Sequence, residues 1–314
     1  MTSPAGFSYQ PTTPVVGPTP PSPAPVPGPA PTPSPLTRLG PLAGLVGKWA
    51  GTGFNAIWRP DHTAGTDRFL ELNMTTETLT FEAIDGDIPN RGLLQDDLTM
   101  TGVSYLQKIS DSNLKAGLHL EPGLWLSVPA TTNPAVPSTV ARLASIPHGT
   151  TIVAQGLATA SATAPHIPPV SLDPFSIGNP AGTLVFAEQT LATASNFRTS
   201  GPGLDGITQA VVDNPNSVLT AAAAGLSVAS TTMLQISSDK TPVLGGGTAN
   251  IAFLQGDIAP NADAALIAAT FWLQTTQGAI EPDLLQYTQT VLLNFSGLSW
   301  PHVSVATLRR QPSS

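Results

Sequence analysis

His302 is the histidine best placed to do chemistry in this chain of 314 residues. It stands in the segment 298–310, LSWPHVSVATLRR, whose residues alternate between apolar and polar as in a β-strand. Alternation places His302, Ser304 and Ala306 on one face, so small side chains leave room beside the imidazole for a bulky planar group. A core histidine that bonds to a neighbouring strand would need the same room. The residues alone therefore support either a ligand-binding imidazole or a packed one.

One further histidine is a candidate for the lining of a site. His148 ends the loop RLASIPH and precedes Gly-Thr-Thr, where a long loop is expected to return to a strand. Loop residues that a rigid barrel holds in place often carry function. Arg142 begins the same loop. His119 shares a strand face with Glu121, but two possible ligands are too few for a metal site.

The composition excludes several kinds of chemistry. The chain has no cysteine, which rules out disulfides, thiolate metal sites, iron–sulfur clusters and cysteine nucleophiles. A metal or cofactor must therefore be held by the five histidines, or by carboxylates, tyrosine or methionine. The net charge of −8 argues against nucleic-acid binding. No P-loop, HExxH or GxSxG motif is present, and the GxGxxG string at 201–206 is expected to be a loop.

The first 36 residues form a tract rich in proline, alanine, threonine and serine, without a charged residue. Such a tract favours extended polyproline II structure and has little apolar surface to bury. We expect residues 1–36 to be a disordered arm, which acts as a spacer or contacts a proline-binding module of another protein. The chain shows neither a secretory signal nor an apolar run long enough to cross a bilayer. We therefore expect a cytoplasmic protein with no membrane span.

Residues 37–314 are predicted to form one all-β domain. Period-two alternation begins near Asp67 and recurs as far as residue 310, with turn signals such as Asp85-Gly86 between the segments. About ten strands are more than one open antiparallel sheet usually carries. The pattern therefore predicts a closed antiparallel up-and-down β-barrel of about ten strands.

Insertions into this barrel are expected around 129–182 and 203–228. Pro-rich loops are predicted at 129–148 and 159–182, and Ala-rich short helices at 204–212 and 217–226, while 183–192 has the texture of a strand.

Two segments at the ends of the predicted domain resemble the nitrobindin-like haem-binding β-barrels, relatives of the fatty-acid-binding and lipocalin group. The residues Gly47, Trp49, Gly51 and Gly53 match the GxWxGxG string that opens the first strand in that family. The run from Pro301-His302 to Arg309 matches the family's last strand, whose histidine is the proximal iron ligand. The resemblance implies that His302 is the axial ligand of a haem b iron.

The same resemblance implies nitric oxide, peroxynitrite or peroxide chemistry, in an enzyme of the isomerase or peroxidase type if turnover occurs. His148, His119 and Arg142 are then the candidates for the distal side of the haem. Family domains are much shorter than 37–314, and their distal residues match no position of this chain. A metal-free carrier of an apolar small molecule, a lipid or a pigment, therefore stays open as the alternative.

The two end segments are expected to meet where the barrel closes. Trp49 is predicted to plug one end and to stack against Arg309 or Arg310 as a cation–π pair. The opposite face of the last strand, with Val303 and Val305, is apolar and needs cover. An insertion or a second copy of the chain, in a homo-oligomer, is expected to supply it.

Overall fold

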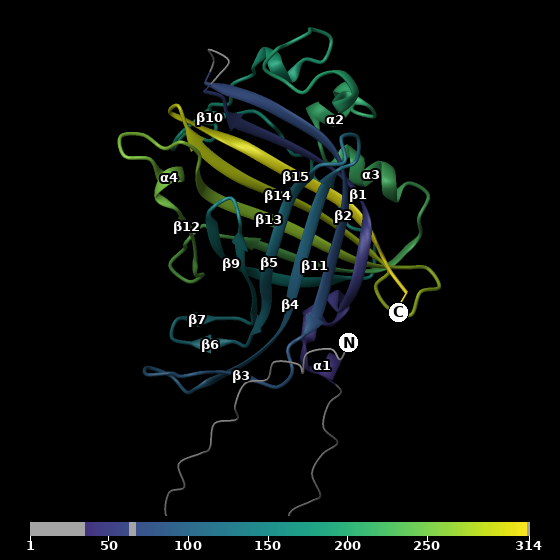
Figure 1. Ribbon diagram of the computed structural model, residues 1–314. Helices are drawn as coiled ribbons and strands as arrows, with labels where there is room; N and C mark the ends of the chain where they lie inside the picture. Colours follow the sequence, from purple (N-terminus) through teal and green to yellow (C-terminus); the bar gives the residue numbers. More distant parts are fainter. Residues whose placement is uncertain (1–34, 63–66, 313–314) are drawn as a thin grey trace, which may run out of the picture.

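Ten strands close into an antiparallel barrel in this computed structural model, which describes residues 35–62 and 67–312 (Figure 1). The order around the barrel is β1-β2-β4-β5-β8-β9-β11-β13-β14-β15, and β15 pairs with β1 to complete the ring. The predicted closed up-and-down β-barrel is confirmed. Its strands are β1 (Gly47–Pro60), β2 (Arg68–Ala83), β4 (Leu98–Asp111), β5 (Gly117–Val128), β8 (Thr139–Ile146), β9 (Thr150–Ser161), β11 (Val228–Ser237), β13 (Asp263–Thr276), β14 (Leu284–Phe295) and β15 (Leu298–Arg310).

Short elements connect these strands. The small strands are β3 (Ile88–Asn90), β6 (Thr131–Thr132), β7 (Ala135–Val136), β10 (Phe175–Ser176) and β12 (Gly246–Asn250). The helices are α1 (Pro35–Arg38), α2 (Gln209–Asp213), α3 (Ser217–Ala223), α4 (Ala252–Gln255) and the 3-10 helices η1 (Gly40–Leu45), η2 (Ala187–Gln189) and η3 (Gly201–Leu204). Within 35–62 and 67–312, no helix has the length and apolar character to cross a bilayer.

Two expectations about the insertions are wrong. The interval 129–148 is not all loop, because its second half is the barrel strand β8, whose alternation starts only after Pro137 and is obscured by the prolines before it. The interval 183–192 contains η2 and turns instead of a strand. Its apolar residues pack outside the barrel, where the ring of Phe186 stacks on Trp300 with centroids 5.3 Å apart.

The predicted short helices and the 201–206 loop are present, whereas most of the predicted arm is not described by the structure. The two short helices are present as α2 and α3, and the 201–206 string forms η3 and a turn. Of the arm predicted at 1–36, residues 1–34 lie outside the described residues.

Glycines let the first and last strands approach closely at the point of closure. A Cβ atom at Gly53 would lie 2.1 Å from the carbonyl oxygen of Val305 in β15. At the same seam, the guanidinium of Arg310 lies 4.4 Å from the ring centre of Trp49. The predicted cation–π contact is therefore confirmed with Arg310, whereas Arg309 pairs with Asp283.

This close approach makes a prediction about Gly53. Replacing Gly53 with alanine is expected to lower the free energy of unfolding by about 1–3 kcal/mol, because β15 must move away from the added methyl group. Gly117→Ala is the matched control, since nothing lies within 4 Å of a Cβ at that strand position. Urea denaturation of both variants tests the prediction, and equal midpoints would contradict it.

The barrel interior is packed at one end and hollow at the other. Around Trp49, side chains of η1 join Trp125, Phe271 and other interior residues in one apolar cluster. The outward valines Val303 and Val305 belong to a second cluster, which side chains of the insertions such as Leu172 and Leu219 cover. The expected cover is thus supplied by the chain itself.

Candidate functional site

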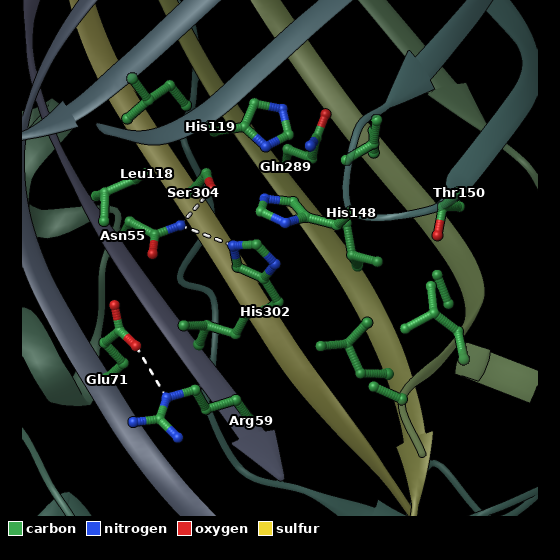
Figure 2. A pocket seen from close by; sticks show the side chains of 18 of the residues that line it. Asn55, Arg59, Glu71, Leu118, His119, His148, Thr150, Gln289, His302 and Ser304 are labelled. Carbon is green, nitrogen blue, oxygen red and sulfur yellow. Dashed lines mark hydrogen bonds and ion pairs between the residues drawn. The ribbon is translucent and has the colours of Figure 1, made fainter. Parts of the chain in front are cut away.

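A cavity of about 330 Å³ occupies the barrel end away from η1 (Figure 2). Its walls come from β1, β2, β4, β5, β13, β14 and β15, from the ends of β8 and β9 with the turn between them, and from α4. About half of the lining residues are aliphatic, and they include Ile57, Ile109, Ile146, Leu254, Val291 and Leu293. Polar side chains also line the cavity, among them the ion pair of Arg59 and Glu71.

His302 projects into the cavity from β15, as alternation predicts. The antiparallel register places it opposite Ile57 and places Ser304 opposite Asn55. Nδ2 of Asn55 lies 2.7 Å from Nε2 of His302 and donates to Oγ of Ser304 at 2.8 Å. Burial, with smaller contributions from the neighbouring His119 and His148, lowers the pKa of His302 to about 3. The imidazole is therefore neutral at physiological pH.

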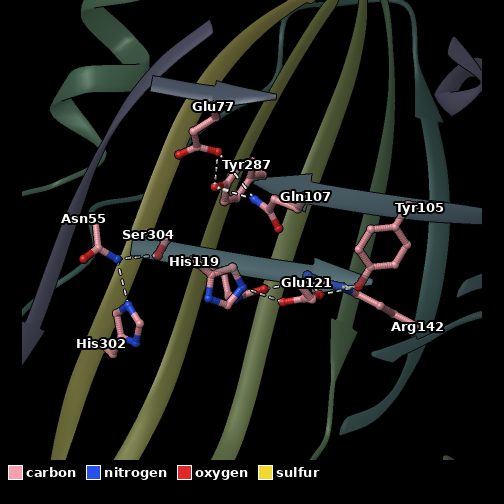
Figure 3. Close-up of polar contacts among 11 residues, drawn as sticks. Asn55, Glu77, Tyr105, Gln107, His119, Glu121, Arg142, Tyr287, His302 and Ser304 are labelled. Carbon is pink, nitrogen blue, oxygen red and sulfur yellow. Dashed lines mark hydrogen bonds and ion pairs between the residues drawn. The ribbon is translucent and has the colours of Figure 1, made fainter. Parts of the chain in front are cut away.

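His119 lines another wall of the cavity and is tied to a buried ion pair (Figure 3). Its Nε2 lies 3.1 Å from Oε2 of Glu121. The other carboxylate oxygen of Glu121 bonds to Nη2 of Arg142 and to the hydroxyl of Tyr105. Burial raises the pKa of Glu121, but the charge of Arg142 and the bonds from His119 and Tyr105 outweigh it and lower that pKa to about 2. Glu121 is thus ionised inside the barrel.

Arg142 lies behind the cavity wall, and it is not among the residues that line the cavity. Its side chain is 1% exposed. Nε donates to Tyr105 at 2.8 Å and Nη1 donates to Oε1 of Gln289 at 2.6 Å. Arg142 therefore acts on the cavity through Gln289 and Glu121, and its charge is balanced by Glu121.

His148 lies in the turn between β8 and β9 and lines the cavity, where the sequence places it at the end of a loop. Its ring centre is 6.0 Å from that of His119 (Figure 2). The cavity therefore brings His302, His119 and His148 together.

Two residues that line the cavity, Gln289 and Asn55, were not predicted from the sequence. Gln289 gives no motif and is recognisable only once β14 is placed beside β15. Asn55, in contrast, follows Gly51 and Gly53 at period two in the opening segment, so its parity with Trp49 could have placed it inside.

A second buried carboxylate lies beneath the cavity. Glu77 of β2 accepts hydrogen bonds from the hydroxyls of Tyr287 at 2.7 Å and Thr75 at 3.0 Å, and from the amide of Gln107 at 3.4 Å (Figure 3). Burial outweighs these bonds and raises the pKa of Glu77 to about 7. Tyr287 and Gln107 line the cavity, so the protonation of Glu77 is linked to the cavity floor.

The described residues contain no group of three or more His, Cys, Asp or Glu side chains that could hold a metal ion by themselves. A haem iron needs less from the protein, because the porphyrin supplies the in-plane ligands and a single histidine suffices.

Comparisons with known proteins assign no family to this chain. The chain matches no family model and no curated protein. Among solved structures, it is similar to the crystal structure of Rv2717c from M. tuberculosis. The two chains are 14% identical, and the match covers 89% of this chain and 98% of that chain with a TM-score of 0.38. The closed antiparallel barrel fits a calycin-like architecture, and the assignment to the nitrobindin-like group stays a prediction.

Proposed function

We propose that this protein binds haem in the barrel cavity, with His302 as the ligand of the iron. The observation that carries the proposal is a neutral imidazole that projects into a cavity inside a closed barrel, where most of the exposed surface is apolar. A neutral imidazole can offer a lone pair to iron, whereas a protonated one cannot. The volume of about 330 Å³ lies at the lower end of the range for ligand pockets. When bound, haem would supply an iron able to bind nitric oxide or to react with peroxynitrite or peroxides.

One contact favours a second candidate, a metal-free carrier of an apolar small molecule. Nε2 of His302 already accepts a hydrogen bond from Asn55. Coordination through this nitrogen requires Asn55 to release it, whereas an apolar ligand without a metal could leave the bond intact.

Titration of the purified protein with haemin, followed by the Soret absorption, tests the haem proposal. We expect a saturable band in the wild type and in His166→Ala, a control because His166 lies outside the cavity. His302→Ala is expected to weaken binding by tenfold or more, an effect of about 1.4 kcal/mol or greater. An unchanged band in His302→Ala would remove His302 from the site.

The substitution Asn55→Ala separates the two candidates. Haem binding is expected to tighten by about fivefold, because the hydrogen bond of about 1 kcal/mol that competes for Nε2 is lost. Haemin titration of the variant measures this change. Unchanged or weaker binding would show that Asn55 does not compete with the iron for Nε2 of His302, and would count against the haem proposal.

A further inference from the structure

Buried groups behind the cavity wall determine which polar atoms of the wall donate hydrogen bonds and which accept them. Glu121 is ionised and can only accept hydrogen bonds, so Nε2 of His119 at 3.1 Å must carry the proton. In the neutral imidazole the lone pair then resides on Nδ1.

Arg142 orients Gln289 so that its side chain can donate a hydrogen bond to a ligand. Nη1 of Arg142 donates to Oε1 of Gln289 at 2.6 Å, so the amide oxygen is engaged and the Nε2 group remains as a donor. In Figure 2 this nitrogen lies on the side of His119 and His148. Gln289 therefore offers N–H groups to a ligand.

His302 is also set as a donor. Asn55 is oriented by two further bonds, because its Nδ2 donates to Ser304 at 2.8 Å and its Oδ1 accepts from Nδ2 of Asn73 at 3.4 Å. Its N–H therefore faces Nε2 of His302, which accepts at 2.7 Å, and the ring proton resides on Nδ1. Figure 2 shows the second ring nitrogen of His302 turned away from Asn55.

We infer that His119 is the hydrogen-bond acceptor of the cavity and that it binds the hydroxyl group of an apolar ligand through Nδ1. Gln289 and His302 complement it with donors, so the cavity distinguishes the two hydrogen-bonding directions. This inference rests on the proposed role of the cavity in ligand binding, and it concerns the chain without haem, because haem would occupy the same cavity.

A matched pair of probes tests this inference on the full chain, 4-phenylphenol and 4-methylbiphenyl, which differ in one hydroxyl against one methyl group. Calorimetric titration is expected to show 4-phenylphenol binding about fivefold tighter, the value of one neutral hydrogen bond of about 1 kcal/mol. In His119→Leu the ratio is expected to fall to about one, with binding of 4-methylbiphenyl retained. A preference that survives in His119→Leu, or that is lost in His148→Leu instead, would overturn the assignment.

A second measurement keeps the test independent of how well the variants fold. Nitrogen-15 NMR of the histidine rings in the wild type distinguishes the tautomers, and we expect the proton of His119 on Nε2. A proton on Nδ1 would overturn the inference. If neither probe nor haem binds, the proposed function fails together with the inference. If haem binds but the probes show no hydroxyl preference, the inference alone fails.

Discussion

Glu121→Gln is expected to lower the free energy of unfolding by about 3–5 kcal/mol at neutral pH, because it leaves Arg142 as an unpaired charge inside the barrel. Both side chains are almost inaccessible, with exposures of 0% and 1%. Urea denaturation measures the change. The double variant Glu121→Gln/Arg142→Met should recover part of the loss, because it removes the unpaired charge as well.

The matched control is an ion pair near the cavity mouth that water screens. Glu71→Gln breaks the contact of Glu71 with Arg59 at 3.0 Å, where the side chains are 31% and 42% exposed. Its cost is expected to be at most about 1 kcal/mol. Equal losses in Glu121→Gln and Glu71→Gln would contradict the description of a buried, tightly coupled pair.

The contribution of Glu121 also has a defined pH window. Because its pKa is lowered from 4.5 to about 2, its stabilising effect is complete above pH 4.5 and is lost as the pH falls toward 2. The difference in the free energy of unfolding between the wild type and Glu121→Gln should therefore shrink as the pH falls from 4.5 toward 2.

Glu77→Gln is expected to have the second largest effect, in the opposite pH range. The pKa of Glu77 is raised from 4.5 to about 7, so the folded chain holds this proton more tightly than the unfolded chain. The stability from this group is present below pH 4.5 and is lost as the pH rises through 7, by about 3 kcal/mol in all. Glutamine carries no such charge, so the variant should be more stable than the wild type at pH 8.

Chemical denaturation at a series of pH values between 5 and 8 measures this difference. Tyr287→Phe provides a second readout, because loss of the hydroxyl that donates to Glu77 should raise the pKa of the carboxyl further and extend the decline to higher pH. If the free energy of unfolding changes with pH in the same way in the wild type and in Glu77→Gln, the result would contradict a Glu77 that stays neutral up to about pH 7.

Local alternation predicted the barrel and the orientation of its last strand. In β15 the parity of His302 and Ser304 against Val303 and Val305 correctly separated the cavity face from the outer face. The closure contact between Trp49 and Arg310 followed from the Gly-spaced opening segment and the position of the arginines at the end of the chain. These features depend on residues close together in sequence or on the two ends of one domain.

Alternation does not tell which face of a strand is inside when both faces are covered. In β2, Leu70 and Leu72 pack outward under the insertions, while Glu71 and Glu77 face the interior. Leucines would ordinarily be assigned to the inner face, and only the covering layer reverses the assignment.

The buried ion pair of Arg142 and Glu121 could not be predicted from the sequence for a different reason. Arg142 is stable inside the barrel only because Glu121, 21 residues away along the chain, lies beside it. That proximity follows from the register of β5 and β8, which pairs Trp125 with Arg142 and which no short motif encodes. A charged residue in a Pro-flanked stretch therefore suggested a loop.

Native mass spectrometry of the protein purified from haem-supplied cells tests whether the cavity holds haem through His302. We expect one haem per chain in the wild type and none in His302→Ala, with the His302→Ala chain still folded by circular dichroism. A wild-type chain that carries no haem, or that carries a metal-free molecule in its place, would contradict the claim.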